Sequence, residues 1–145
     1  MSHFNIRVYA LIFNEDDEIL ISDENFNGHC ITKFPGGGLE YGEGPPECLQ
    51  REAIEEFGQE IEILGHFYTT DFFQKALYFE DTQLISIYYT ACLKEEPRFA
   101  IEKSSIPVKL PNPNMQHFRW VALDSLIDEH LTFPIDKHVL RLLKE

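Results

Sequence analysis

Residues 36–59 read GGGLEYGEGPPECLQREAIEEFGQ, a stretch that combines three successive glycines, two prolines and many carboxylates. Proline suits the first turn of a helix, where its missing N–H costs nothing, and glycine suits the left-handed residue that ends one. The stretch therefore predicts a helix of about three turns that begins at Pro45 and Pro46 and ends before Gly58.

The predicted helix has an apolar face and a charged face. Four side chains with helical spacing should pack against the rest of the protein: Leu49, Ala53, Ile54 and Phe57. The other side carries one cation and three carboxylates: Arg51, Glu52, Glu55 and Glu56. Like charges on neighbouring turns cost a few tenths of a kcal/mol per pair, so this face should attract a further cation.

Hard divalent cations such as Mg²⁺ prefer carboxylate and carbonyl oxygens and can hold substrate phosphates at the same time. The glycines complement the carboxylates, because a loop without Cβ atoms lets carbonyls turn toward a metal and lets phosphates approach the main chain. We therefore expect a glycine loop and the helix to form a metal and phosphate site. A glutamate-rich helix is more often a solvated face, but the glycine run and the positions of Glu43 and Arg51 favour the site.

The spacing of these residues resembles the signature of the Nudix hydrolases, the MutT-like pyrophosphohydrolases, which cleave nucleoside diphosphates linked to another group. The resemblance covers residues 37–59, and every charged and glycine position is filled: Gly37, Glu43, Arg51, Glu52, Glu55, Glu56 and Gly58. The one departure is Gln59, where the family usually has an aliphatic residue.

The resemblance implies a catalytic role for three glutamates. Glu55 and Glu56 would bind the metal, together with the backbone carbonyl of Gly36. Glu52 would be either a further metal ligand or the base that orders or deprotonates the attacking water. The implied cofactor is Mg²⁺, with Mn²⁺ as the alternative ion.

Other residues are expected to support the site or to contact the substrate. Arg51 and Glu43 should form an ion pair that holds the loop against the helix. We assign substrate contacts to Gly37, Gly38 and Glu40. A further acidic ligand from outside the motif is left open among five residues: Glu80, Asp81, Glu95, Glu96 and Glu102.

Composition limits the class of protein and of partner. A chain of 145 residues with 43% hydrophobic and 13% aromatic residues should fold as a single globular domain, here a Nudix domain over residues 1–145. A net charge of −13 argues against a nucleic-acid polymer or an anionic membrane as the main partner, and leaves small nucleoside diphosphate derivatives. Three widely spaced cysteines, no leader pattern and no long apolar run favour a cytoplasmic protein.

The remaining pattern predicts strands at 4–13, 18–22, 60–70, 83–93 and 117–121, and a terminal helix at 134–143. The strand at 83–93 has a nearly continuous apolar centre and should be buried, and the aromatic segment 71–81 should be a specificity loop. The fold class is α/β, and the resemblance implies an α/β/α sandwich with a mixed β-sheet between helices.

Two questions stay open at this stage. The chain could be a non-catalytic Nudix-like module that binds a nucleotide or regulates a partner, although an intact acidic helix favours the enzyme. The substrate could be a nucleoside triphosphate, ADP-ribose or another sugar nucleotide, a dinucleoside polyphosphate or coenzyme A. A homodimer is common among relatives and is one possible assembly, but the oligomeric state is left open.

Overall fold

The computed structural model describes residues 1–145, which form eight strands, two α-helices and two short 3₁₀ helices. The strands make two four-stranded sheets, so the α/β class is confirmed. The chain divides into two compact units, Met1–Leu11 with Gly36–Arg98, and Ile12–Pro35 with Phe99–Glu145. The organisation of the two units as one domain stays a prediction.

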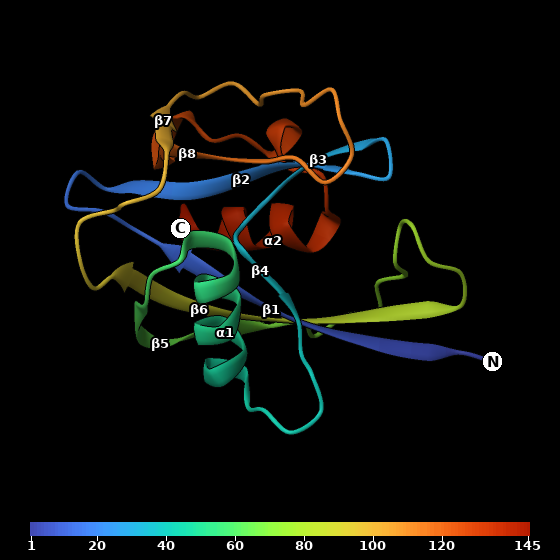
Figure 1. Ribbon diagram of the computed structural model, residues 1–145. Coiled ribbons are helices and arrows are strands. Elements are labelled where there is room, and N and C mark those ends of the chain that lie inside the picture. The colour runs from blue at the N-terminus through green and yellow to red at the C-terminus, as the bar shows by residue number, and fades with distance from the viewer. The chain divides into compact units, whose positions relative to one another are not determined.

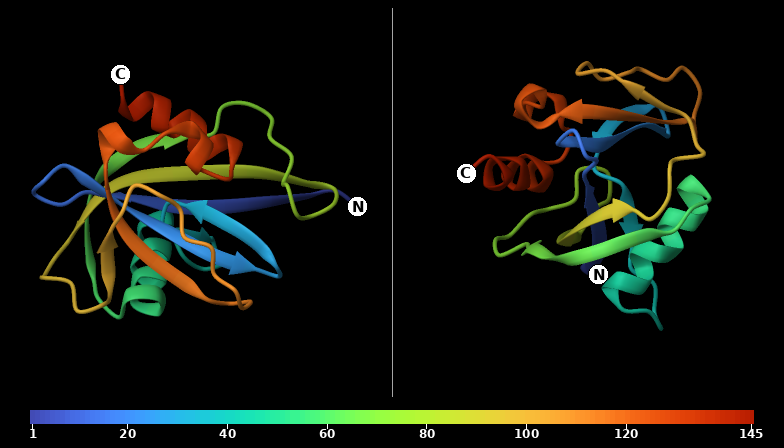
Figure 2. Two further views of the ribbon diagram at one scale, coloured as in Figure 1. Left: turned by 90° about the horizontal axis from the view of Figure 1, so that it is seen from above. Right: turned by 90° about the vertical axis from the view of Figure 1, so that its left-hand side faces the viewer.

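The first unit contains one sheet and one helix. Its elements are β1 (His3–Ile12), β4 (Gly36–Gly38), α1 (Pro45–Phe57), β5 (Ile61–Thr69) and β6 (Thr82–Leu93). The strand order is β4-β1-β6-β5, and α1 lies beside β4 and β5 (Figures 1 and 2). Tyr9 of β1 and Tyr88 of β6 are buried and stack with ring centroids 5.2 Å apart.

The predicted helix is confirmed at both ends. Gly44 precedes it in an extended conformation, its N–H donates to Glu47 Oε1 over 3.0 Å, and Gly58 ends the helix with a left-handed φ of 69°. Three of the four predicted apolar side chains are buried: Leu49, Ala53 and Phe57. The prediction for Ile54 was wrong, because this side chain lies outside the packed stripe and is 51% exposed.

Two further expectations for this unit were wrong. Residues 36–38 are not a loop but a short strand, in which Gly37 lies opposite Val8 of β1. In β6 only Ser86, Tyr88 and Ala91 are buried, although the apolar run predicted a wholly buried strand. Side chains alternate between the two faces of a strand, and here one face keeps partial contact with solvent.

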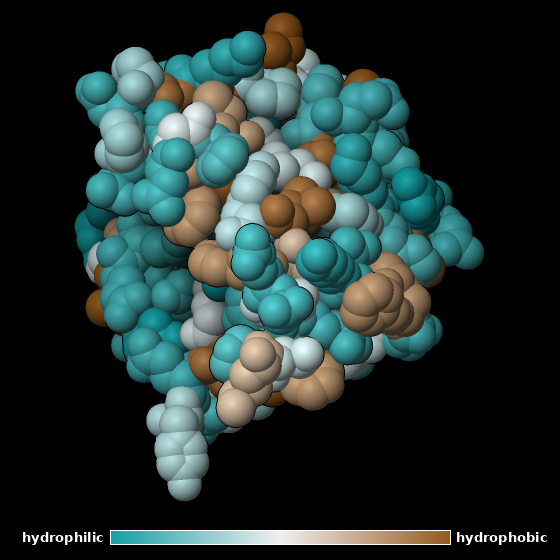
Figure 3. All heavy atoms as spheres, turned by 90° about the vertical axis from the view of Figure 1, so that its right-hand side faces the viewer, coloured by the Kyte–Doolittle hydropathy of each residue, from teal (hydrophilic) through white to brown (hydrophobic).

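The connection between β5 and β6 was predicted as a specificity loop. It folds back on itself, since the Ala76 N–H donates to the Thr82 carbonyl and the Leu84 N–H donates to the Gln74 carbonyl. Several of its apolar side chains are exposed: Phe72, Phe73, Leu77 and Phe79. Figure 3 shows apolar residues, in tan and brown, among hydrophilic ones on the face that includes this segment.

The second unit contains a mixed sheet. Its strands are β2 (Glu18–Phe26), β3 (His29–Lys33), β7 (Ile101–Lys103) and β8 (Gln116–Ala122), in the order β3-β2-β8-β7. The β7–β8 pair is parallel, whereas the pairs β2–β3 and β2–β8 are antiparallel. Two 3₁₀ helices, Leu123–Ser125 and Asp128–His130, lead to α2 (Pro134–Leu143), which confirms the predicted terminal helix.

A buried ion pair holds the centre of this second sheet. The Arg119 side chain on β8 is fully buried, and its Nε and Nη2 donate to the two carboxylate oxygens of Asp23 on β2. Asp23 also accepts from Thr32 Oγ1 over 2.7 Å, and Arg119 Nη1 donates to the Ser104 carbonyl over 2.9 Å. These bonds join all four strand regions of the unit.

We predict that Arg119→Met destabilises the protein by about 3–5 kcal/mol, because the substitution leaves the Asp23 carboxylate buried without its cation. The control is Arg141→Met, which removes a guanidinium that is 61% exposed and pairs with Asp128, and which should cost under about 1 kcal/mol. Urea unfolding measures both. Equal effects of the two substitutions would contradict the importance assigned to the buried pair.

Candidate functional site

The predicted site residues of α1 gather around the guanidinium of Arg51. Its Nε and Nη2 donate to Glu43 over 3.0 and 2.8 Å, and its Nη1 donates to Glu52 over 3.0 Å and to Glu55 over 3.2 Å. Nη2 also donates to the Gly38 carbonyl over 2.9 Å. The guanidinium therefore links the segment before α1, the helix itself and β4.

Glu43 and Glu40 belong to the same cluster. The expected Arg51–Glu43 ion pair is present, and hydrogen bonds from Arg51 and then from the backbone N–H of Glu40 lower the pKa of Glu43 to about 2. Glu40 was predicted to contact substrate, and its carboxylate lies 3.7 Å from Arg51 Nε with the side chain 66% exposed. Glu43 is thus held ionised as a structural partner, and Glu40 lies at the open side of the cluster.

The Glu52 carboxylate fills the space that a side chain at position 37 would need. A Cβ atom on Gly37 would lie 2.0 Å from Glu52 Oε2, so only glycine leaves room for this carboxylate. Burial, followed by the negative charge of Glu56, raises the pKa of Glu52 to about 6. Glu52 is therefore a carboxylate that can change its protonation state close to neutral pH.

The structure requires glycine at position 36 for a reason that the sequence analysis did not predict. Its φ is 147°, and an added Cβ would lie 2.1 Å from the Val8 carbonyl oxygen, so glycine permits β4 to approach β1. Gly38 lies at the other end of the strand and accepts hydrogen bonds at its carbonyl from Arg51 and from the Cys48 thiol. Glycine at position 36 therefore fits β4 against β1, and glycine at position 37 leaves room for Glu52, while the expected contacts of the glycines with metal and substrate stay predictions.

Glu55 and Glu56 complete the acidic face. The Glu55 side chain is 56% exposed and shares Arg51 with Glu52. Glu56 is partly exposed and close enough to Glu52 for its charge to raise the pKa of that group. The structure thus brings together all three predicted catalytic glutamates on one side of α1.

The donor set of this face is suited to a hard divalent cation. No group of three or more His, Cys, Asp or Glu side chains is placed closely enough to hold a metal ion in the present arrangement. The available donors are nevertheless all carboxylate oxygens, which Mg²⁺ prefers, and a cationic guanidinium lies between two of them. The chemistry of the residues therefore fits the expected cofactor.

The acidic residues outside the motif have other contacts. Glu95 pairs with Arg98, and Glu102 lies 3.4 Å from His117 in the second unit. The carbonyls of Glu80 and Asp81 accept hydrogen bonds from Thr82 and His3, respectively. None of these contacts selects one of the five as a further metal ligand.

Three residues that support α1 were not predicted from the sequence. The Cys48 thiol donates to the Gly38 carbonyl over 3.5 Å, and burial, followed by the charge of Glu43, raises its pKa to about 12. The side-chain amides of Gln50 and Gln59 bond to the backbone of segments that are distant in sequence. No local sequence pattern predicts such contacts, because each depends on where another segment of the chain packs against the helix.

Comparison with known proteins places the chain in a family. The sequence model of the NUDIX domain matches residues 3–143. This chain belongs to the NUDIX family. The expected membership of the Nudix family is thereby confirmed.

Two curated relatives of this Nudix chain carry names of hydrolases. An RNA pyrophosphohydrolase of Sulfurovum sp. (strain NBC37-1) is 39% identical over 104 residues, which cover 67% of this chain and 62% of that protein. An 8-oxo-dGTP diphosphatase of Escherichia coli (strain K12) is 41% identical over 51 residues, which cover 34% of this chain and 40% of that protein. The match therefore spans less than two thirds of the length of either relative.

Solved structures of the family share the fold. A NUDIX hydrolase from Nitrosomonas europaea has a TM-score of 0.72 at 17% identity, with 97% of this chain and 88% of that chain covered. This likeness confirms the Nudix fold that the motif implied. Neither helix of the chain is long and apolar enough to cross a membrane.

We predict that Glu52 makes folding stability depend on pH. Its pKa of about 6 in the folded protein exceeds the ordinary value of 4.5, so the folded state binds the proton more tightly and stability falls as pH rises between these values. Glu52→Gln should therefore be more stable than the wild type at pH 7.5, by up to about 1 kcal/mol because solvent screens part of the charge, and equally stable near pH 4.

Urea unfolding across this pH range provides the measurement. Glu60→Gln is the control, because it removes an exposed carboxylate that pairs with Lys94 outside the acidic face. A wild type and a Glu52→Gln variant whose stabilities run parallel from pH 4 to 7.5 would contradict the assigned environment of Glu52.

Proposed function

We propose that this Nudix chain is a Mg²⁺-dependent enzyme that hydrolyses a phosphoanhydride bond in a small nucleoside diphosphate derivative. The observation that supports the proposal most strongly is the placement of Glu52. Its carboxylate is partly buried against Gly37, its pKa is raised to about 6, and it stands on the same helix side as Glu55 and Glu56. A purely solvated acidic face would have neither the glycine cradle nor the raised pKa.

The carboxylates of Glu55 and Glu56, with the Gly36 carbonyl, would hold Mg²⁺, or Mn²⁺ as the alternative ion, and Glu52 would act as the base. The bound ion would offset negative charge on the attacking and leaving oxygens. Glu52 accepts the proton of the attacking water as the water oxygen bonds to phosphorus, and the bridging P–O bond breaks with its electron pair on the departing phosphate.

Arg51 and Glu43 would position the helix and would not react themselves. Their paired bonds, with the bond from Arg51 to the Gly38 carbonyl, keep the acidic side of α1 facing β4. In the proposed complex, backbone groups of Gly37 and Gly38 and the side chain of Glu40 contact the substrate. Glu40 is suited to this role by its exposure at the open side of the cluster.

The net charge of −13 favours a small substrate, since a long phosphate backbone would be repelled by an acidic protein. A second candidate is the 5′ end of an RNA, because the Sulfurovum relative is named an RNA pyrophosphohydrolase. The name of the Escherichia coli relative instead suggests a modified nucleoside triphosphate. The non-catalytic module, the homodimer and the cytoplasmic location stay predictions beside this proposal.

We predict that phosphate release from a panel of nucleotides, sugar nucleotides and a 5′-triphosphorylated RNA occurs with Mg²⁺ and favours the small substrates. Glu55→Gln and Glu56→Gln should each lower turnover by about 10²-fold or more, because each removes a ligand for the charge-neutralising cation. The fold should persist, since these substitutions reduce repulsion on α1.

Glu60→Gln is the matched control, because Glu60 is an exposed carboxylate that pairs with Lys94 outside the acidic face. Its turnover should equal that of the wild type. Tight nucleotide binding without turnover in the wild type would support the non-catalytic module, and turnover that Glu55→Gln and Glu56→Gln leave unchanged would overturn the site.

We also predict that Gly37→Ala lowers turnover at least tenfold with a smaller change in KM. The added methyl group would lie 2.0 Å from Glu52 Oε2 and must push the carboxylate from its place. Gly65→Ala is the control, because a Cβ there has no neighbour within 4 Å and the backbone is not left-handed. Steady-state kinetics of both variants would show a selective loss in Gly37→Ala, and equal activities would refute the predicted cradle.

A further inference from the structure

The amide of Gln50 forms a two-bond bridge from α1 to β5. Gln50 Nε2 donates to the Ile61 carbonyl over 2.7 Å, and the Ile61 N–H donates to Gln50 Oε1 over 3.3 Å. β5 is an edge strand, so the outer backbone groups of Ile61 have no neighbouring strand to bond. The side-chain amide supplies the donor and acceptor that a further strand would have supplied.

The amide of Gln59 forms a second bridge of the same kind just beyond α1. Gln59 is 3% exposed, its Nε2 donates to the Glu96 carbonyl over 3.1 Å, and the Arg98 N–H donates to its Oε1. Both ends of a buried amide are thereby satisfied by one short segment after β6. The bridge joins the C-terminal end of the helix to a segment 37 residues later in the chain.

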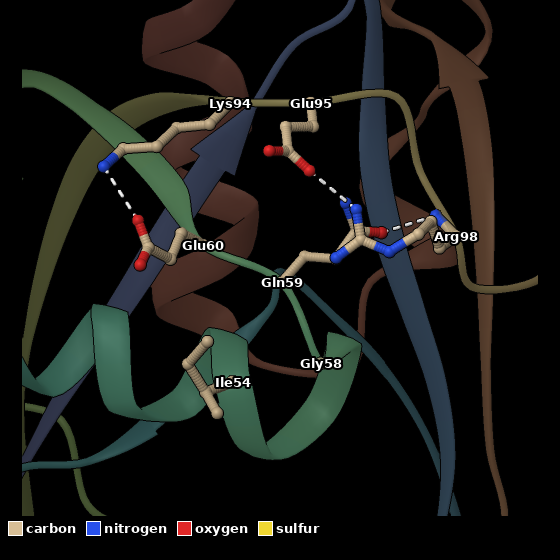
Figure 4. A pocket seen from close by; sticks show the side chains of 7 residues that line it. All are labelled: Ile54, Gly58, Gln59, Glu60, Lys94, Glu95 and Arg98. Carbon is tan, nitrogen blue, oxygen red and sulfur yellow. Dashed lines mark hydrogen bonds and ion pairs between the residues drawn. The ribbon is translucent and has the colours of Figure 1, made fainter.

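The Gln59 bridge lies beside a cavity. A cavity of about 310 Å³ separates the end of α1 from the segment after β6, and it is lined by Ile54, Gly58, Gln59, Glu60, Lys94, Glu95 and Arg98 (Figure 4). The ion pair Lys94–Glu60 crosses its rim, whereas the pair Arg98–Glu95 lies within the segment after β6, and both are exposed and contribute little. The buried amide of Gln59 adds two hydrogen bonds between the end of α1 and this segment.

The Gln50 bridge holds α1 from the side away from its acidic face, and the Gln59 bridge holds the chain just beyond the C-terminal end of the helix. With 3.6 residues per turn, Gln50 points to nearly the opposite side of the helix from Glu52. Arg51 and Cys48 hold the other side through the Gly38 carbonyl. We propose that Gln50 and Gln59 are positioning residues, whose paired amide bonds set the placement of α1 and so align Glu52, Glu55 and Glu56 with β4.

This inference rests on the proposed function, because it concerns the same carboxylates. Catalytic groups must be held close to their productive geometry, and a displacement of about 1 Å can cost about 10²-fold in rate. A shift of α1 would move the three carboxylates together relative to Gly36 and Gly37. The loss should therefore fall mainly on kcat, whereas substrate contacts outside α1 would keep KM nearly constant.

The test replaces each amide by an apolar group of similar shape. Gln50→Met and Gln59→Met should lower kcat about 10- to 100-fold, change KM less than about threefold and weaken Mn²⁺ binding severalfold, measured by the paramagnetic resonance of free Mn²⁺. Gln116→Met is the matched control, because Gln116 is an exposed glutamine whose amide donates to Ser22 and Glu24 within the second unit. This control should keep wild-type kcat and wild-type Mn²⁺ binding.

Gln50→Asn and Gln59→Asn provide a second pair of variants in case the methionine variants fail to fold. They keep an amide but shorten it by one methylene group, so neither bridge can form and the same loss of kcat is expected. Folded variants at either position with wild-type kcat and wild-type Mn²⁺ affinity would overturn the inference. A loss of kcat that Gln116→Met shares equally would also overturn it.

Hydrogen exchange of the α1 amides separates this inference from the proposed function. Faster exchange along α1 in the bridge variants than in Gln116→Met supports positioning, whether or not the wild type hydrolyses any compound of the panel. A wild type without turnover would refute the proposed function alone. Unchanged exchange along α1 in folded bridge variants would refute the positioning role alone.

Discussion

The hydrogen-bonding fork of Arg51 is the interaction on which the acidic side of α1 depends. One guanidinium bonds the side chains of Glu43, Glu52 and Glu55 and the backbone carbonyl of Gly38, so helix, strand and intervening segment share one partner. A lysine could not replace it, because an ammonium group lacks the planar arrangement of five donors. The same guanidinium offsets repulsion that the carboxylates would otherwise exert on neighbouring turns of the helix.

The environment of Glu52 connects folding energetics with chemistry. Burial against Gly37 and the nearby charge of Glu56 disfavour the ionised carboxylate, and they raise its pKa to about 6. Ionised Glu52 therefore makes the folded state less stable at neutral pH than a neutral side chain would. Without a cation, the same placement makes Glu52 a stronger base than an exposed glutamate. In the proposed reaction, a cation near this face would favour the ionised form again.

Local chemistry in the sequence was sufficient to predict α1 and the cluster around it. Prolines, Gly58 and the spacing of Glu43 and Arg51 act over one or two helical turns, so their outcome follows from neighbouring residues alone. The role of Gly36 could not be predicted, because the close atom belongs to β1, about 28 residues earlier in the chain. The exposure of Ile54 and the bridge made by Gln59 likewise depend on where the segment after β6 returns to the helix.

The acidic face contributes repulsion to α1, so the helix must draw its stability from elsewhere. Its buried side supplies Leu49 and Phe57, its first turn is closed by Glu47, and the amide of Gln50 bonds it to β5. None of these contacts uses a carboxylate of the proposed metal site. Because the stabilising contacts and the carboxylates of the proposed site are different groups, those carboxylates can be placed to suit a reaction without being needed for the stability of the helix. The buried contacts and the Gln50 bridge thus hold the helix on one side, while Arg51 links its acidic side to the Gly38 carbonyl.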